Sequence, residues 1–434
     1  MKFVIISLFL LLLFAVVLKK GQQRAVLTLI GLFVFNTTIS IQPFDSYALL
    51  CSAFTLSLLF HKEFRSEWKN FPFKSIMLLL LVIHICVVVL DPRVSGLLKI
   101  ISRIFNNFVP RYWALFVGYS MVSSLRVARG TCAKLCLLFG VMTIYGCMTY
   151  VLQGNPYDDL LHLSFGDEIG IWSEVQTRGY RVFSTLNNPI VYGFVMCMAA
   201  SLVYLFRERL SKVAYVALIL LCLLNVFLAN SRTGVVCGLL LVVLFLLLKN
   251  GISIRLVGSC VAIVLLFSVL YYTIPFVKEA SDSVMDIFLT GGENTSGSTV
   301  ELKDNQLEIS LILFAVHPYF GHGFNYFQEV IMEKDASTIE VLAGMEGFGY
   351  KLLIEEGVFM IIAVAILFFA LIWNFFKLML NSKCSLPCMG IAWTISFLAF
   401  LLLAGIYGGI FTIGMILIGM LLRMSVLSNS SMID

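Results

Sequence analysis

Residues 231–249 read SRTGVVCGLLLVVLFLLLK, which is a tight polar turn, an unbroken apolar run and a closing lysine. Apolar runs of this kind recur along most of the 434-residue chain, whose mean hydropathy is +0.97 and whose charged residues make up only 13%. Soluble domains carry about 25% charged residues, and a run of roughly 20 apolar residues is needed to cross a bilayer. The chain is therefore predicted to be a polytopic membrane protein.

Lipid offers the backbone no hydrogen-bond partners, so we expect the apolar runs to be helices. The prediction is an all-α fold with about 12–13 membrane-spanning helices in a single integral membrane domain over residues 1–434. The predicted spans lie near residues 3–18, 25–41, 47–60, 75–90, 111–126, 132–152, 188–206, 213–229, 234–248, 254–272, 352–376, 388–404 and 407–422.

Lysine and arginine are sorted between the gaps that separate these spans. They concentrate in alternate gaps, beginning with Lys19, Lys20 and Arg24 and ending with Arg423. Because cytoplasmic loops are enriched in Lys and Arg, this side is predicted to be cytoplasmic, with a periplasmic N-terminus and a cytoplasmic C-terminus. The two long gaps, 153–187 and 273–351, then become periplasmic loops, and long loops commonly carry function. A formal charge of +5 suggests no nucleic-acid partner.

The segment RGYRVFSTLNNP (residues 178–189) lies where the first long loop meets a span. Arg178 and Arg181 are three positions apart, so in a helix their guanidinium groups share one face and converge on one anion. The alternative is that they anchor the span at the outer headgroups. Basic residues are scarce at outer span ends, which favours an anion-binding role.

The segment NSRTG (residues 230–234) is a tight outer turn between two apolar spans. Arg232 has no carboxylate close to it in the sequence, and a charge at this depth usually faces a polar cavity. The alternative is an interfacial arginine whose side chain extends to water. We favour the first interpretation, which makes Arg232 a second candidate for binding an anion.

The segment HPYFGHGFN (residues 317–325) comes late in the second long loop. Its proline and two glycines indicate a sharp turn. Histidine exchanges protons near neutral pH, so His317 and His322 are candidate bases. The alternative is a packed loop in which both histidines only bond to the backbone. A metal site is disfavoured because no carboxylate spacing completes it.

The segment EGFGYKLLIEEG (residues 346–357) leads into the span near 352–376. Its glutamates lie at an apolar boundary, where burial would raise a carboxyl pKa and create a base. This makes Glu346 a third candidate base. The alternative is solvated loop charge, which we expect for Glu355 and Glu356.

At these residues the chain resembles the O-antigen polymerase (Wzy-like)/O-antigen ligase superfamily of polytopic bacterial glycosyltransferases. The shared features, in order, are Arg181 before a span, Asn188 and Pro189 at its start, the turn residues Ser231, Arg232 and Gly234, the run from His317 to Gly323, and Glu355 with Gly357. The resemblance implies a GT-C-like helical fold with a large periplasmic loop. It also implies donor glycans linked to undecaprenyl pyrophosphate.

One departure from the superfamily bears on the reaction. Its ligases resemble one another in carrying a histidine, followed by a small or polar residue, eleven positions before the glycine that aligns with Gly357. This chain has Glu346 and Gly347 there. The difference favours a polymerase of O-antigen or capsule repeat units over a ligase.

The resemblance implies an enzyme of lipopolysaccharide biosynthesis at the periplasmic face of the bacterial inner (plasma) membrane. Arg181 and Arg232, supported by Arg178, would stabilise the departing pyrophosphate, and Glu346, His317 or His322 would accept the proton of the acceptor hydroxyl. The outer loops contain no Asp-x-Asp metal pair, so we expect a metal-independent reaction without a cofactor. Expected partners are the bilayer, undecaprenyl-pyrophosphate-linked glycans and a chain-length regulator.

Three rival functions remain. A structural membrane subunit without chemistry would not need convergent outer arginines. An O-antigen ligase would transfer the same donor glycan to lipid A–core. A flippase or transporter of lipid-linked oligosaccharides would carry charged residues inside several spans and two-fold internal repeats. The sequence has only His84 as an ionisable residue in mid-span and no repeat.

Overall fold

The computed structural model describes residues 1–35, 39–165, 180–251, 300–326, 329–330, 347–381, 385–405 and 409–430, with a few single positions between 258 and 282. Arg178, Glu346 and most of the predicted span near 254–272 lie outside the described residues. Predictions that concern them therefore stay predictions.

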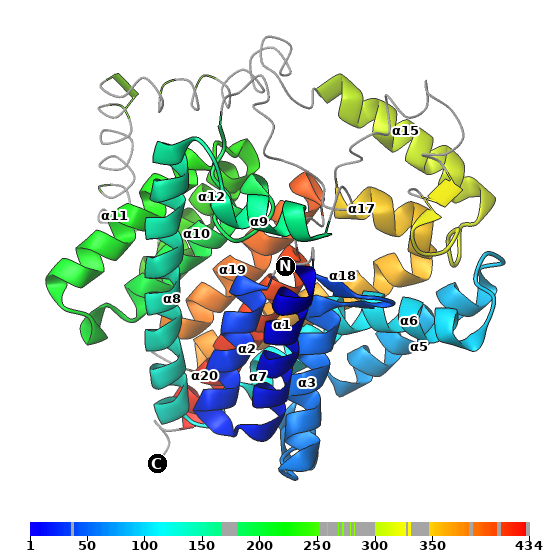
Figure 1. Ribbon diagram of the computed structural model, residues 1–434, viewed down its shortest axis with the longest axis horizontal. Helices are drawn as coiled ribbons and strands as arrows, with labels where there is room; N and C mark the ends of the chain where they lie inside the picture. The colour runs from blue at the N-terminus through cyan, green and yellow to red at the C-terminus, as the bar shows by residue number, and fades with distance from the viewer. Residues whose placement is uncertain are drawn as a thin grey trace.

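The described chain is almost entirely helical (Figure 1). The first half contains α1 (Lys2–Leu18), α2 (Gly21–Val34), the paired strands β1 (Ser40–Ile41) and β2 (Phe44–Asp45), α3 (Ser46–Phe60), α4 (Phe64–Asn70), α5 (Lys74–Leu90), α6 (Leu97–Phe108), the π-helical turn η1 (Val109–Trp113), α7 (Ala114–Ser120), α8 (Leu125–Leu152) and α9 (Pro156–Phe165). The second half contains α10 (Pro189–Leu205), the 3-10 turn η2 (Arg207–Arg209), α11 (Lys212–Leu228), α12 (Arg232–Asn250), α15 (Val300–Val316), α17 (Phe348–Lys351), the π-helical turn η4 (Leu352–Glu356), α18 (Gly357–Leu380), α19 (Ser385–Ala404) and α20 (Ile410–Ser430).

Helices long and apolar enough to cross a membrane confirm the all-α polytopic fold. Within the described residues five helices qualify by length and composition, or six if α4 and α5, bent by 102°, count as one broken span. Four predicted spans are present as shorter apolar helices, namely α1, α3, α10 and α11. A 17-residue helix is about 26 Å long, slightly less than the roughly 30 Å of a hydrocarbon core. The number of helices that qualify is therefore smaller than the 12–13 spans expected.

Two predicted boundaries are wrong. The predicted span near 111–126 contains a break, because α7 ends at Ser120 and α8 begins at Leu125, where the Ser124 side chain caps the new helix. The last helix does not end before Arg423 but continues to Ser430. Arg423 is buried and donates to the Tyr119 hydroxyl at 2.8 Å. Its hydrogen bond within the protein makes an arginine tolerable inside an apolar helix.

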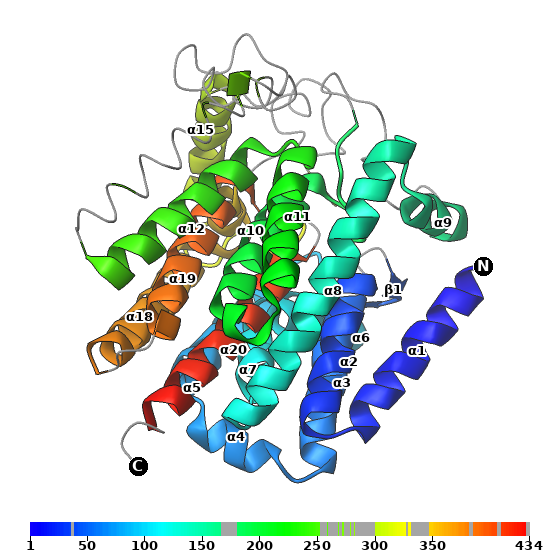
Figure 2. The same ribbon diagram turned by 90° about the vertical axis from the view of Figure 1, so that its left-hand side faces the viewer.

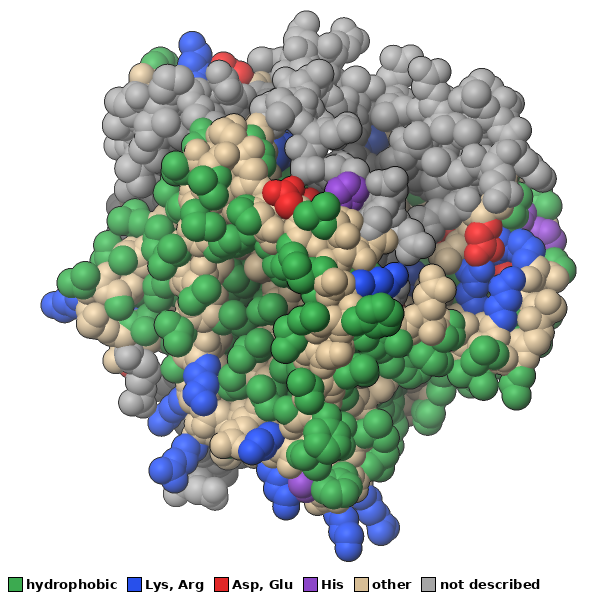
Figure 3. Space-filling model, viewed as in Figure 1, with side chains coloured by type: hydrophobic (Ala, Val, Ile, Leu, Met, Phe, Trp, Pro, Cys, Tyr) green, Lys and Arg blue, Asp and Glu red, His purple; other side chains and the backbone are tan. Residues whose placement is uncertain are grey.

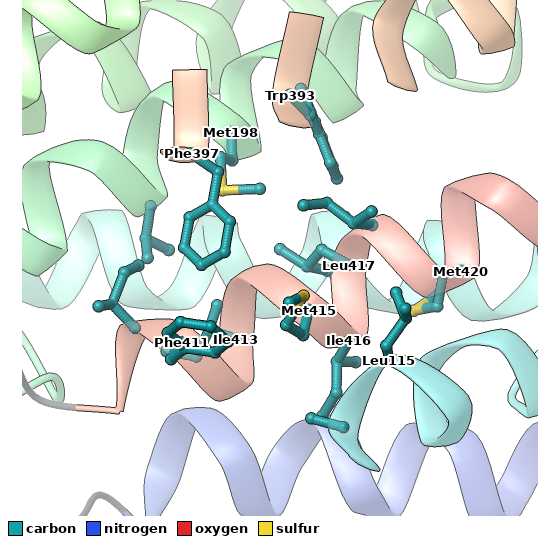
Figure 4. Packing of buried hydrophobic residues seen from close by; sticks show 14 of the residues in the cluster. Leu115, Met198, Trp393, Phe397, Phe411, Ile413, Met415, Ile416, Leu417 and Met420 are labelled. Carbon is teal, nitrogen blue, oxygen red and sulfur yellow. The ribbon is translucent and has the colours of Figure 1, made fainter. Parts of the chain in front are cut away.

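The core forms around α20, which lies inside the molecule against α7 and α19 (Figure 2). Two glycines permit the close approach of α20 and α7, since a Cβ on Gly118 or Gly419 would collide with a backbone carbonyl of the facing helix. Larger apolar side chains fill the remaining space, including Trp393 and Phe397 from α19 (Figure 4). Small residues that bring helix backbones together are typical of membrane proteins.

The two ends of the helical body differ. The N-terminal end of α1 lies near α9, whereas the C-terminus leaves α20 at the end that carries α4 (Figure 2). Lys and Arg side chains gather around this second end (Figure 3). Exposed apolar side chains such as Phe3 and Leu11 cover the surface between the ends, as a lipid-facing surface requires.

Candidate functional site

The segment 317–325, which we call the histidine turn, packs against the start of α18. The His322 N–H donates to the Ile354 carbonyl at 2.8 Å, and the Gly323 N–H donates to the Glu355 carbonyl at 3.0 Å. Two motifs that the sequence analysis treated separately therefore form one backbone-bonded unit.

Glycines make this close packing possible. Gly321 and Gly357 have φ values of +66° and +73°, a region that other residues rarely adopt. A Cβ on Gly321 would collide with the backbone of Glu355, and one on Gly357 would collide with the carbonyl of Tyr319. Neither position tolerates a side chain without moving the histidine turn away from η4.

The expectation that Glu355 and Glu356 are solvated is wrong, because their exposed fractions are 1% and 0%. Glu356 is held by Arg111, whose Nη1 donates to its Oε1 at 2.7 Å. Its other oxygen lies 3.6 Å from Nε2 of His84. Arg111 belongs to η1 and Glu356 to η4, so two π-helical turns meet through this ion pair. Such turns are frequent at functional sites.

Glu355 differs from its neighbour. Neither of its carboxylate oxygens has a hydrogen-bond partner among the described residues. Among the described residues the cation that lies within 4 Å of it is Lys351, with 3.9 Å between Nζ and Oε2. The Glu355 carboxylate is thus buried, and its negative charge is only weakly compensated by Lys351.

The ring of Phe324 connects the histidine turn to the buried charges. It stacks on the ring of His84 with 5.1 Å between centroids and an interplanar angle of 26°. The guanidinium carbon of Arg111 lies 5.8 Å from its centroid, within the range of a cation–π interaction. The turn therefore rests on the same two side chains that surround Glu356.

A second set of charges holds the outer side of the histidine turn. Asp91, at the end of α5, accepts two hydrogen bonds from the Arg93 side chain, at 2.9 and 2.7 Å. Arg93 in turn donates to the carbonyl of His322 at 3.0 Å and to that of Phe324 at 3.2 Å. Arg103 of α6 donates to the Phe324 carbonyl as well, at 2.8 Å. These bonds satisfy the carbonyl groups of His322 and Phe324 and fix the backbone of the turn at these residues.

The ring of His322 is oriented by its own contacts. Its Nε2 lies 2.9 Å from the Leu313 carbonyl, which can only accept, so this nitrogen carries the proton and Nδ1 keeps a free lone pair. The ring of Tyr326 stacks on it at 4.2 Å. Burial lowers the pKa of His322, and His317 and Arg93 lower it further against the opposing effect of the Leu313 bond. A neutral imidazole with an available lone pair suits a general base.

His317 differs from His322 in its surroundings. It is exposed, and its ring meets that of His322 edge-on at 4.6 Å. The structure therefore brings these two candidate bases together. The third, Glu346, lies outside the described residues.

The other sequence-predicted residues come together around the end of α11. Arg181 donates through Nε to the Ala229 carbonyl at 3.2 Å, and the Val182 N–H donates to the Leu228 carbonyl at 3.0 Å. These bonds attach the segment before α10 directly to the turn that precedes Arg232. We call Arg181 and Arg232 the arginine pair. Arg178 lies outside the described residues.

The helix ends beside the arginine pair are capped. Ser231 accepts from the Gly234 N–H at 3.0 Å, so Arg232 is the first residue of α12. Asn188 caps α10 by accepting from the Ile190 N–H at 2.8 Å. A helix N-terminus carries a partial positive charge and favours anions. Here it adds to the charge of a partly buried arginine.

A polar network that the sequence analysis missed anchors the Arg181 segment to α8 and α9. Asn155 donates to the Ser184 carbonyl at 2.7 Å and accepts from the Tyr145 hydroxyl at 2.7 Å. The Ser184 hydroxyl donates to the Met142 carbonyl at 3.0 Å. No motif in the sequence signals this network, because its members are single residues scattered over helix α8, the turn before α9 and the segment before α10.

The buried partners of Glu356 were missed as well. The sequence did mark His84 as the lone ionisable residue within a predicted span, but nothing linked it to Arg111 or Glu356. Their positions are far apart in the chain, and only the fold joins them. Among the described residues no cluster of three His, Cys, Asp or Glu side chains could hold a metal ion.

Comparison with known families gives one match. Residues 216–342, less than a third of the chain, are similar to the family described as O-antigen ligase. The match includes Arg232, His317 and His322 and supports the O-antigen ligase/polymerase superfamily, as the motifs predicted. It supports a membrane glycosyl-transferring enzyme of the ligase or polymerase kind that acts on lipid-linked glycans. No curated protein matches the chain.

Proposed function

We propose that the protein polymerises undecaprenyl-pyrophosphate-linked O-antigen or capsule repeat units at the periplasmic face of the inner membrane. The observation that carries this is the bond from Arg181 to Ala229, which attaches one conspicuous outer arginine to the turn of the other. Two guanidinium groups beside a helix N-terminus suit a diphosphate.

The reaction is a displacement at the anomeric carbon of the donor glycan. The acceptor hydroxyl oxygen forms the new bond, and the bond from the anomeric carbon to the diphosphate oxygen breaks. The electron pair of that bond leaves with undecaprenyl pyrophosphate. Arg181 and Arg232, with Arg178 in support, stabilise the negative charge that develops on the leaving group.

The acceptor hydroxyl must lose its proton during this step. Of the candidate bases, His322 is the one we favour, because it is oriented by Leu313 and Tyr326 and its pKa is lowered by burial. The proton passes to Nδ1 of its ring and then to solvent. His317 and Glu346 are the competing assignments, and variants at each position separate them.

The mechanism requires the arginine pair and the histidine turn to meet at the donor's anomeric carbon. Helix α19 packs against both α12, which begins at Arg232, and α18, whose first turn contacts the histidine turn. The two regions are thus mounted on neighbouring helices.

A polymerase is preferred to a ligase because Glu346 and Gly347 stand where ligases carry their histidine motif. Reconstitution of the full chain with a lipid-linked repeat unit as sole substrate tests this choice. A polymerase lengthens the glycan without lipid A–core, whereas a ligase produces only glycan joined to added lipid A–core. Transport of the repeat unit without any new glycosidic bond would instead indicate a flippase.

A further inference from the structure

We propose that His84, Arg111 and Glu356 form a buried positioning unit that holds His322 in place for proton transfer. The inference rests on the proposed function for its catalytic consequence. Its structural part concerns only how the histidine turn is held. We call the three side chains the buried charge cluster.

The first step is that the cluster is sealed inside the protein. The side chains of His84 and Glu356 are 0% exposed, and that of Arg111 is 11% exposed. A buried carboxylate without a partner is strongly unfavourable, and Arg111 supplies that partner at 2.7 Å. Removing either charge leaves the other uncompensated, so the cluster is held together by its own electrostatics.

The second step concerns the contact between His84 and Glu356. Nδ1 of His84 lies 3.0 Å from the Leu80 carbonyl and must donate to it. Nε2 then points a lone pair toward Oε2 of Glu356 at 3.6 Å, and neither atom has a hydrogen-bond partner among the described residues. A distance of 3.6 Å is too long for a hydrogen bond, so the ring and the carboxylate oxygen are neighbours in the buried interior without a direct bond between them.

The third step links the cluster to the histidine turn. Phe324, two residues after His322, lies on His84 and beside Arg111. The backbone just before Glu356 accepts the bonds from the N–H groups of His322 and Gly323. A shift of Glu356 or of His84 therefore moves the segment that carries His322.

The fourth step is that α5 supplies both supports of the turn. His84 and Asp91 are seven positions apart, which places them on the same face of this helix. His84 supports the inner side through Phe324, and Asp91 supports the outer side through Arg93 and the His322 carbonyl. The histidine turn is thus supported from two sides by His84 within α5 and by Asp91 at its C-cap.

The test uses the full chain in lipid nanodiscs with isotope-labelled histidine. The chain has five histidines, so the ring signals are few, and His322→Gln identifies the signal of His322. The test variants are Glu356→Gln and His84→Gln, and two are used because one of them could fail to fold. The control is Arg24→Gln, which breaks an equally short but part-buried ion pair, Arg24 to Glu63 at 2.7 Å, that contains no residue of the histidine turn or of the buried charge cluster.

We expect the His322 signal to shift in both test variants and to stay in place in the control. Because a displacement of about 1 Å can cost about 100-fold in rate, kcat should fall by about 10- to 100-fold while KM changes by less than about 3-fold. An unchanged His322 signal in the folded test variants overturns the proposal. A shifted signal with unchanged kcat retains the positioning role and instead overturns His322 as the base.

Discussion

Arg111 Nη1 lies 2.7 Å from Glu356 Oε1, although 245 positions of sequence separate the two residues. Each sits in a π-helical turn, at the points where α6 gives way to α7 and where α17 gives way to α18. The pair joins the N-terminal helices to the segment that carries the histidine turn. The site on the C-terminal half of the chain is therefore completed by residues from outside the matched family domain.

Gly323 and Gly96 provide a matched test of the close packing at the histidine turn. Both have a φ of +90°, but a Cβ on Gly323 would collide with Asp91, whereas nothing lies within 4 Å of one on Gly96. Either Gly→Ala change introduces backbone strain of about 1–3 kcal/mol. Only Gly323→Ala should also displace the turn and abolish glycan synthesis.

The readouts are thermal stability and product length, measured on both variants in the same membranes. If Gly96→Ala lowers activity as much as Gly323→Ala, strain alone accounts for the effect and the contact with Asp91 is unimportant.

The pH dependence of the reaction reports on His322. Its pKa is lowered by burial, so the neutral base persists below pH 6.5, the ordinary value. The rate constant kcat/KM should therefore stay high through pH 6.5 and fall only at more acidic pH. The folded protein should lose stability as pH falls below the ordinary value, because the unfolded chain then binds the proton more tightly.

Tyr326→Ala removes the ring that stacks on His322 and should move the acidic limb of the rate profile toward higher pH. Tyr319→Ala removes a ring that is 63% exposed and should leave the limb in place. An acidic limb that persists unchanged in His322→Gln would show that another group is the base.

Ser231 and Ser211 test the role of the helix end beside the arginine pair. Each caps a helix through its hydroxyl, Ser231 for α12 and Ser211 for α11. Replacing either by Ala should lower the free energy of unfolding by about 1 kcal/mol. Only Ser231→Ala should also weaken binding of the diphosphate donor, measured as KM for the lipid-linked repeat unit. If both substitutions change KM equally, the N-terminus of α12 does not contribute to donor binding.

The side of the membrane is testable with introduced cysteines. Tyr319 in the histidine turn and Ser66 in α4 are both exposed. We expect Tyr319→Cys to react with a membrane-impermeant thiol reagent in intact spheroplasts and Ser66→Cys to react only after the membrane is opened. The reverse pattern would place the histidine turn in the cytoplasm, on the wrong leaflet for the proposed donor.

The sequence predicted the fold class because hydrophobicity and charge sorting are properties of local composition. It also singled out Arg181 and Arg232 as candidates for one anion site. The bond from Arg181 to Ala229 shows that their segments adjoin, and their role stays a prediction. Helix boundaries were less accurate. Arg423 was placed in the tail because an arginine normally ends an apolar run, yet Tyr119 and Val122 accept its hydrogen bonds inside the protein.

The buried charge cluster could not have been predicted in the same way. Glu356 looks like a loop charge in sequence, and only the approach of Arg111 from a distant helix makes its burial stable. The preference for His322 over His317 also depends on tertiary contacts. Both histidines belong to the same short motif, but only one stacks on Tyr326 and faces Leu313.

The central claim is that guanidinium groups of the arginine pair stabilise the departing diphosphate. The most direct test is the elongation rate of a lipid-linked repeat unit by the purified chain carrying Arg181→Ala or Arg232→Ala, with Arg126→Ala as an exposed control. Each arginine variant should lose about 100- to 1,000-fold in kcat, and the corresponding Arg→Lys variants should also fail because lysine lacks the bidentate fork. Normal-length glycan ladders from a folded Arg181→Ala or Arg232→Ala protein would contradict the claim.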